Sequence, residues 1–210
     1  LTVDPAWANL PDDEAVVNND PAFINEVVRP INAQDGDLLK VSPFKGIEDG
    51  TWAQGTAKYE KRGVAAFVPV WNEANCIQCN QCSFVCPHAV IRPVLMTEAE
   101  AANAPQGLEY KDAIGAKELK FHMAISPLDC TGCGNCAQVC PAKEKALVMK
   151  PLESQLAKTA HWDYTAHQVT AKPNPMNKNT VKGVQFEQPL LEFSGACAGC
   201  GETPYAKLVT

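Results

Sequence analysis

The sequence predicts an α+β fold in which one strand–loop–turn–strand unit occurs twice. Two cysteine runs of the form Cys-x2-Cys-x2-Cys-x3-Cys-Pro begin at Cys76 and Cys130, so each cysteine of the second run lies 54 residues after its counterpart. Phe67 and Phe121 share this offset, each nine residues before its run. Two such units predict a small domain over residues 64–151 in which strands and short helices are related by a pseudo-two-fold axis.

Stretches rich in β-branched and aromatic residues flank both cysteine runs, as is typical of strands. The predicted strands are residues 64–71 and 89–95 around the first run, and 119–125 and 146–149 around the second. Between the two units, residues 97–118 form an insertion. Within it Thr97 and Glu100 have the spacing of a capping box, which predicts a short helix over residues 97–102.

Residues 1–63 are interrupted by prolines and glycines and predict an extended arm without a core of its own. A two-turn helix is expected at residues 21–28, ended by Arg29 and Pro30, and a strand at residues 37–41. A flexible linker is the alternative, but Phe23 and Trp52 are too apolar for a pure linker.

After the second unit, we expect residues 152–188 to form a helix followed by a linker. The linker is expected because residues 172–179 are rich in helix-breaking residues. Residues 189–193 then read as a strand. Thr203 and Pro204 have the residue types of a helix N-cap and first turn. We interpret residues 189–210 as the start of a further domain.

The cysteine spacing is typical of a domain that binds two [4Fe–4S] clusters, in which three cysteines of each run hold one cluster and the fourth holds the other. Only the thiolate form of cysteine is a ligand. The two expected ligand sets are Cys76, Cys79, Cys82 and Cys140 for cluster 1, and Cys130, Cys133, Cys136 and Cys86 for cluster 2. Two clusters that share runs in this way lie close together, which favours electron transfer between them.

Two other uses of the cysteines compete with this interpretation. A structural zinc site usually joins two separated CxxC pairs into one tetrahedron, whereas each run here already holds four thiols. A disulfide framework is compatible with the cysteine count, but a chain of 210 residues can bury a core without disulfides.

Cys197 and Cys200 form a further CxxC, for which the sequence has no second pair. Two cysteines can supply only part of a third [4Fe–4S] site. We therefore expect the chain to be a piece of a longer polypeptide or one part of a larger assembly. A redox-active or zinc-binding CxxC is the alternative.

Composition excludes several classes of function. The net charge is −6, and there is no basic stripe of the kind that binds nucleic acid. No apolar run approaches the roughly 20 residues that span a bilayer. Ten cysteines without an export signal favour metal binding in a reducing, cytoplasmic environment.

Three segments resemble the pyruvate:ferredoxin (flavodoxin) oxidoreductases: GTAKYEKRG at residues 55–63, CIQCNQCSFVCPH at 76–88 and EFSGACAGCGETPY at 192–205. The resemblance covers the chain from about residue 37 onward. It implies a dicluster ferredoxin-like domain followed by the beginning of a thiamine-binding domain.

This resemblance implies a homodimeric enzyme with thiamine diphosphate, Mg²⁺ and three [4Fe–4S] clusters. Such an enzyme converts pyruvate and coenzyme A to acetyl-CoA and CO2, and reduces ferredoxin or flavodoxin. Cys197 and Cys200 would then hold the cluster nearest the thiamine, and Glu202 is a candidate contact of the thiamine pocket. The 2-oxoacid could differ from pyruvate, because its pocket lies in other parts of the enzyme.

Residues in and beside the cysteine runs carry three further expectations. His88 is expected to be a surface histidine, and Lys143 and Lys145 a solvated turn, with docking of an acidic ferredoxin as the alternative. Four apolar residues are expected to exclude water from the clusters, namely Ile77, Phe84, Val85 and Val139. The competing functions are a free-standing dicluster ferredoxin and a zinc-stapled interaction module.

Overall fold

The computed structural model describes residues 20–197 and 199–210. The chain separates into two compact units, Leu1–Tyr59 and Glu60–Thr210. The first 19 residues of the predicted arm lie outside the described residues. The second unit mixes strands with short helices, which confirms the α+β class.

The described part of the first unit is a set of short helices with a small core, not an extended arm. Ile24 and Val27 are buried, and Phe23 and Trp52 meet edge to face with ring centroids 5.2 Å apart. A π-helical turn, Ile24–Val28, continues directly into α1 (Arg29–Asn32).

The predicted helix end at Pro30 is therefore wrong. In the π-helical turn the Arg29 N–H bonds to the carbonyl of Ile24, five residues back. This wider turn accommodates the proline ring, which would clash with the carbonyl four residues back in a regular α-helix. The helix therefore continues past Pro30 to Asn32.

The predicted strand at residues 37–41 is also wrong. Two 3₁₀ turns, Gly36–Leu38 and Ser42–Phe44, occupy this region. Leu38 and Val41 are 80% and 87% exposed. Among the described residues, no neighbouring strand pairs with this segment. Residues 37–41 therefore do not form a strand, although they include apolar side chains.

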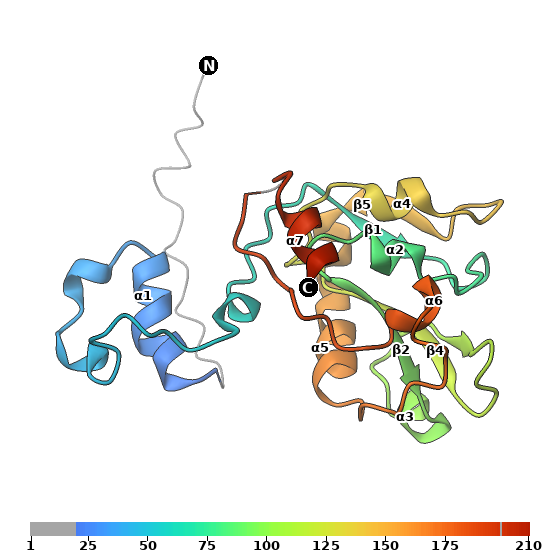
Figure 1. The fold of residues 1–210 in the computed structure, drawn as a ribbon, viewed down its shortest axis with the longest axis horizontal. Helices are drawn as coiled ribbons and strands as arrows, with labels where there is room; N and C mark the ends of the chain where they lie inside the picture. The colour runs from blue at the N-terminus through green and yellow to red at the C-terminus, as the bar shows by residue number, and fades with distance from the viewer. Residues whose placement is uncertain (1–19, 198) are drawn as a thin grey trace, which may run out of the picture. The chain divides into compact units, whose positions relative to one another are not determined.

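The second unit contains two small antiparallel sheets (Figure 1). The strands are β1 (Phe67–Trp71), β2 (Ile91–Met96), β3 (Lys111–Asp112), β4 (Lys120–Ile125) and β5 (Leu147–Pro151). The four strands predicted around the cysteine runs are thus confirmed to within a few residues at each end. Strand β1 pairs with β5, β2 pairs with β4, and β3 extends the second sheet.

This pairing joins the two cysteine units to each other. The strand that enters the first run pairs with the strand that leaves the second, from Phe67 opposite Pro151 to Trp71 opposite Leu147. The strand that leaves the first run pairs with the strand that enters the second. Each of these two strand pairs takes one strand from each unit, so both cysteine runs are held in one core.

Buried side chains from both sheets make up that core. Val68, Trp71, Ile91, Phe121 and Leu147 are each at most 4% exposed, and three of the cysteines pack with them. The buried cysteines are Cys86, Cys130 and Cys136.

The helices of the second unit are short. Helix α3 (Glu98–Ala102) begins with the predicted capping box between Thr97 and Glu100. The others are α2 (Gln81–Phe84), α4 (Asn135–Val139), α5 (Thr159–His167), α6 (Val181–Val184) and α7 (Thr203–Val209), with a 3₁₀ segment Leu152–Lys158 before α5. Figure 1 shows α5 beside the β2–β4 sheet. In the part of the chain that the structure describes, no helix is long and apolar enough to cross a bilayer.

The predicted strand at residues 189–193 is wrong, because this segment is held by side chains instead of by a neighbouring strand. The Arg92 guanidinium forms an ion pair with Glu192 and lies 5.2 Å from the ring centroids of Trp162 and Phe193. Phe193 has φ 47°, outside the range of a strand. Its N–H donates to the carbonyl of His88.

Candidate metal centre

The cysteine loops follow the same path in both units. Gln78 and Gly132, each two residues after the first cysteine, have φ of 56° and 72°. Asn80 and Gly134, directly before α2 and α4, have φ of 60° and 76°. Left-handed backbone at these four positions curls each loop around its own cysteines, and glycine adopts it at least cost.

Each loop turns a backbone N–H toward a cysteine sulfur. The Gln78 N–H donates to Cys76 Sγ at 3.4 Å, and the Gly132 N–H donates to Cys130 Sγ at 3.4 Å. Such hydrogen bonds stabilise negative charge on sulfur. The loops are therefore built to favour thiolates.

Gln78 compensates for its left-handed backbone with its side chain. It is 1% exposed, and its amide donates to the carbonyl of Asp112 at 2.7 Å and accepts from the N–H of Ile114 at 2.8 Å. These two bonds attach the first cysteine loop to the end of β3.

The structure brings the cysteines of the first expected set together. Cys76, Cys79, Cys82 and Cys140 line one small cavity whose other walls include the apolar Met123. Cys140 comes from the second run, so this cavity joins both halves of the domain.

The cysteines of the second expected set also lie near one another. Burial, together with the neighbouring Cys86, Cys130 and Cys133, raises the pKa of Cys136 to about 12. Burial likewise raises the pKa of Cys82, with Cys136 the largest contributor among the nearby thiols. The two sets are therefore adjacent.

This donor set fits iron–sulfur clusters. Burial raises the pKa of Cys130 to about 12, so the thiol would stay protonated at neutral pH without a compensating positive charge. Bound iron supplies such charge and holds the sulfur deprotonated. All ten cysteines are free thiols in the structure. Among the described residues, no three His, Cys, Asp or Glu side chains converge on a site for a single metal ion.

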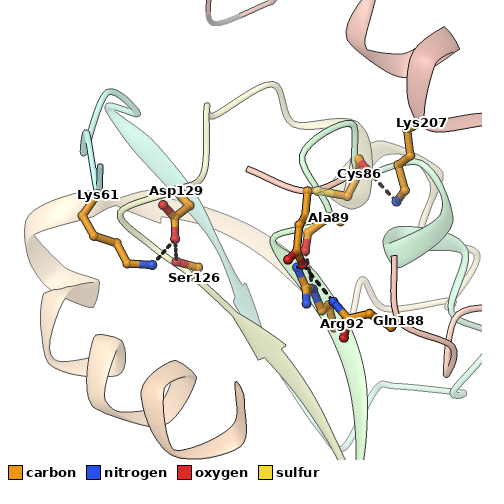
Figure 2. Close-up of polar contacts among 9 residues, drawn as sticks. Lys61, Cys86, Ala89, Arg92, Ser126, Asp129, Gln188 and Lys207 are labelled. Carbon is orange, nitrogen blue, oxygen red and sulfur yellow. Dashed lines mark hydrogen bonds and ion pairs between the residues drawn. The ribbon is translucent and has the colours of Figure 1, made fainter. Parts of the chain in front are cut away.

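The start of the second run is fixed by polar contacts. Asp129, directly before Cys130, is nearly buried and accepts from the Lys61 ammonium and the Ser126 hydroxyl (Figure 2). Next to Lys61, the Arg62 guanidinium donates to the carbonyls of Ser194 and Ala196 at 3.1 and 3.2 Å.

The third cysteine pair lies outside the core. Cys197 is exposed, and Cys200 is partly buried. Hydrogen bonds from the N–H groups of Glu202 and Thr203, at the start of α7, lower the pKa of Cys200. Glu202 itself is exposed and precedes the first residue of α7.

Some predictions about the surroundings of the site are wrong. His88 is not a surface residue: it is 3% exposed, and both of its ring nitrogens are buried without a hydrogen-bond partner. Ile77 lines the cavity of Cys76, Cys79, Cys82 and Cys140 although it is 54% exposed, and Phe84 is 37% exposed. Val85 and Val139 are partly buried. The error for His88 arises because neighbours distant in sequence decide burial next to a loop; the Phe193 N–H, for example, donates to the His88 carbonyl.

Lys143 and Lys145 differ in their surroundings. Lys143 is exposed, whereas the Lys145 ammonium donates to the carbonyls of Gln138 and Cys140 at 3.0 and 2.7 Å. Lys145 therefore binds the end of α4 and is not a freely solvated side chain.

Comparisons with known proteins give the same chemistry. A family described as a 4Fe-4S dicluster domain matches residues 75–144, and a domain of unknown function (EKR) matches residues 11–65. The "Pyruvate-flavodoxin oxidoreductase" of Enterobacter agglomerans is 60% identical over 210 residues, which is 100% of this chain and 18% of that protein. The "Pyruvate:ferredoxin oxidoreductase" of Moorella thermoacetica is 58% identical over 209 residues, or 98% of this chain and 18% of that protein. The chain is homologous to one segment of the pyruvate-flavodoxin/ferredoxin oxidoreductases.

The same segment occurs in enzymes with another name. The "Pyruvate dehydrogenase [NADP(+)]" of Cryptosporidium parvum is 47% identical over 192 residues, which is 90% of this chain and 10% of that protein. The chain spans about a fifth of the length of the oxidoreductases that it matches, or less. These homologues are oxidoreductases, and the dicluster domain indicates electron transfer through [4Fe–4S] clusters.

Proposed function

We propose that the chain is the electron-transfer segment of a thiamine-dependent pyruvate:ferredoxin or flavodoxin oxidoreductase. Such an enzyme converts pyruvate and coenzyme A to acetyl-CoA, CO2 and a proton, and passes two electrons to ferredoxin or flavodoxin. The observation that carries the proposal is the cavity lined by three cysteines of the first run and Cys140 of the second. It is supported by 60% identity along the whole chain to such an enzyme.

In this proposal the eight cysteines of the two runs are the cluster ligands. Cys76, Cys79, Cys82 and Cys140 hold one cluster, and Cys86, Cys130, Cys133 and Cys136 hold the other. When bound, each cluster would accept and release one electron at a time. The two cysteine units are related by a pseudo-two-fold axis, a reading favoured by the matched left-handed positions and crossed strand pairing.

The residues around the cysteines control the charge on sulfur. The N–H groups of Gln78 and Gly132 donate to thiolates and favour the more negative, reduced state. Buried side chains such as Trp71 and Met123 exclude water, which disfavours the added charge. The balance between these opposing effects sets the reduction potentials.

The remaining parts of the enzyme enter only as proposals. Cys197 and Cys200 supply two ligands of a third [4Fe–4S] cluster close to thiamine diphosphate and Mg²⁺, and Glu202 is the candidate contact of that pocket. The complete protein acts in the cytoplasm as a homodimer. Its partners would be pyruvate, coenzyme A and a ferredoxin or flavodoxin, without nucleic acid or membrane.

The test is substrate-driven reduction of the full-length protein under anaerobic conditions. Addition of pyruvate and coenzyme A should produce the paramagnetic resonance signal of reduced [4Fe–4S] clusters, and Cys79→Ser should remove part of it. Clusters that dithionite reduces but pyruvate and coenzyme A do not would refute the proposal. They would favour an independent dicluster carrier.

A further inference from the structure

Lys207 makes an unexpected contact with the first cysteine run. Its ammonium donates to the carbonyls of Ser83 and Cys86 at 2.7 and 2.8 Å, across 124 and 121 residues of sequence. Figure 2 shows the contact with Cys86. These carbonyls lie at and just beyond the C-terminal end of α2, where backbone oxygens carry partial negative charge, and each also accepts one backbone N–H, from Cys86 and Ala89 respectively. A cation is therefore favoured at this place.

In the second cysteine unit, a lysine close in sequence contacts the carbonyl of the equivalent cysteine. Lys145 donates to the carbonyl of Cys140, the counterpart of Cys86 in the 54-residue repeat. In the first unit the position equivalent to Lys145 is Ile91, which is 1% exposed within β2. The first unit lacks its own lysine here, and α7 provides one from the far end of the chain.

The two lysines lie in different surroundings. Lys145 is exposed, whereas Lys207 is partly buried. An ammonium shielded from water interacts more strongly with a nearby charge than an exposed one. Lys207 therefore has the greater effect on charge at its cysteine.

Lys207 also attaches α7 to the rest of the domain. Thr203 at the start of the helix is buried, whereas Tyr205, Leu208 and Val209 are 73%, 60% and 87% exposed and pack little. Among the described residues, Lys207 is the side chain of α7 that hydrogen-bonds to another element. The N-terminal end of this helix donates N–H groups to Cys200. One short helix thus contacts both Cys200 and the loop of Cys86.

We propose that Lys207 is a positioning residue that docks α7 on the loop of Cys86 and raises the reduction potential of the cluster held by Cys86, Cys130, Cys133 and Cys136. The inference rests on the proposed function, since it requires that these cysteines hold a cluster. A fixed positive charge beside a ligand stabilises the added electron of the reduced state. Undocking α7 would remove that charge.

The experiment is a redox titration of the anaerobic, cluster-loaded 210-residue chain, followed by paramagnetic resonance. Lys207→Met should make the reduction potential of one of the two clusters more negative. The affected cluster should be the one whose paramagnetic resonance signal Cys86→Ala also alters. Lys207→Arg keeps the charge and should restore the original potential. The matched control Lys145→Met should shift the other signal, by a smaller amount.

The inference would be overturned if Lys207→Met left both reduction potentials unchanged or shifted both by the same amount. It would also be overturned if Lys207→Met and Lys207→Arg had the same reduction potentials. If Lys207→Met does not retain its clusters, Lys207→Gln makes the comparison, since it keeps a donor without the charge. A potential equal to that of the unmodified chain would then overturn it. Absence of [4Fe–4S] signals from the unmodified chain would refute the proposed function instead.

Discussion

Gln78 offers a direct test of how the first cysteine loop is held. Gln78→Ala removes the hydrogen bonds to Asp112 and Ile114 but keeps a side chain at a residue with φ 56°. Each lost bond leaves a backbone group without its partner at about 1–2 kcal/mol, so the expected loss of stability is about 2–4 kcal/mol. Gln78→Gly loses the same bonds but tolerates the left-handed backbone, as Gly132 does in the second unit.

The difference between the two variants isolates the backbone contribution. Left-handed conformation costs a non-glycine residue about 1–2 kcal/mol, partly offset by the greater unfolded-state freedom of glycine. Gln78→Gly should therefore be about 1 kcal/mol more stable than Gln78→Ala. The assay is anaerobic urea unfolding of the cluster-loaded chain, followed by visible absorbance and far-ultraviolet circular dichroism. This reasoning would be refuted if both variants were as stable as the unmodified chain. It would also be refuted if Gln78→Ala had a higher free energy of unfolding than Gln78→Gly.

Three further predictions test other parts of the account. Cys86→Ala should perturb mainly the cluster of the second cysteine run, measured by paramagnetic resonance after reduction. Gly183→Ala places a Cβ 2.0 Å from the backbone oxygen of Asn177 and should lower stability by about 3 kcal/mol, whereas Gly195→Ala meets nothing within 4 Å and should be near neutral in urea unfolding. Burial lowers the pKa of His122 to about 4, so protonation of this side chain opposes folding below about pH 6.5. The free energy of unfolding should therefore fall as the pH drops from about 6.5 toward 4. His122→Phe should reduce this fall by at most about 1.4 kcal/mol per pH unit, measured by urea unfolding at pH 7.5, 6.5 and 5.5.

Each of these predictions has a contradicting result. Damage confined to the cluster of its own run in Cys86→Ala would contradict crossed ligation. Equal stability of Gly183→Ala and Gly195→Ala would show that α6 relaxes without cost. A pH dependence of stability that is identical in His122→Phe and the unmodified chain would remove His122 as its cause.

The repeat in the sequence was sufficient to predict the centre of the fold. Cysteines at a fixed offset, flanked by apolar stretches, predicted four strands because both units bury their strands in one core. The capping box of Thr97 and Glu100 was equally local and therefore predictable. The ligand assignment of each cysteine stays a prediction, although the structure brings the first expected set around one cavity.

The failures involve segments whose structure depends on distant neighbours. Residues 37–41 and 189–193 have apolar residues but no strand to pair with, and the second segment is fixed by Arg92, 100 residues before Glu192. His88 is buried by residues far away in the sequence. Lys207 gives no local signal, because its contact with Cys86 spans 121 residues of sequence.

The central claim is that two four-iron clusters are bound by eight cysteines from two runs that share ligands. The most direct measurement is iron and acid-labile sulfide content of the anaerobic 210-residue chain, together with low-temperature paramagnetic resonance after reduction. The account predicts about eight irons per chain and the spectrum of two nearby, interacting [4Fe–4S] clusters. A preparation without iron, or one with zinc in its place, would contradict it.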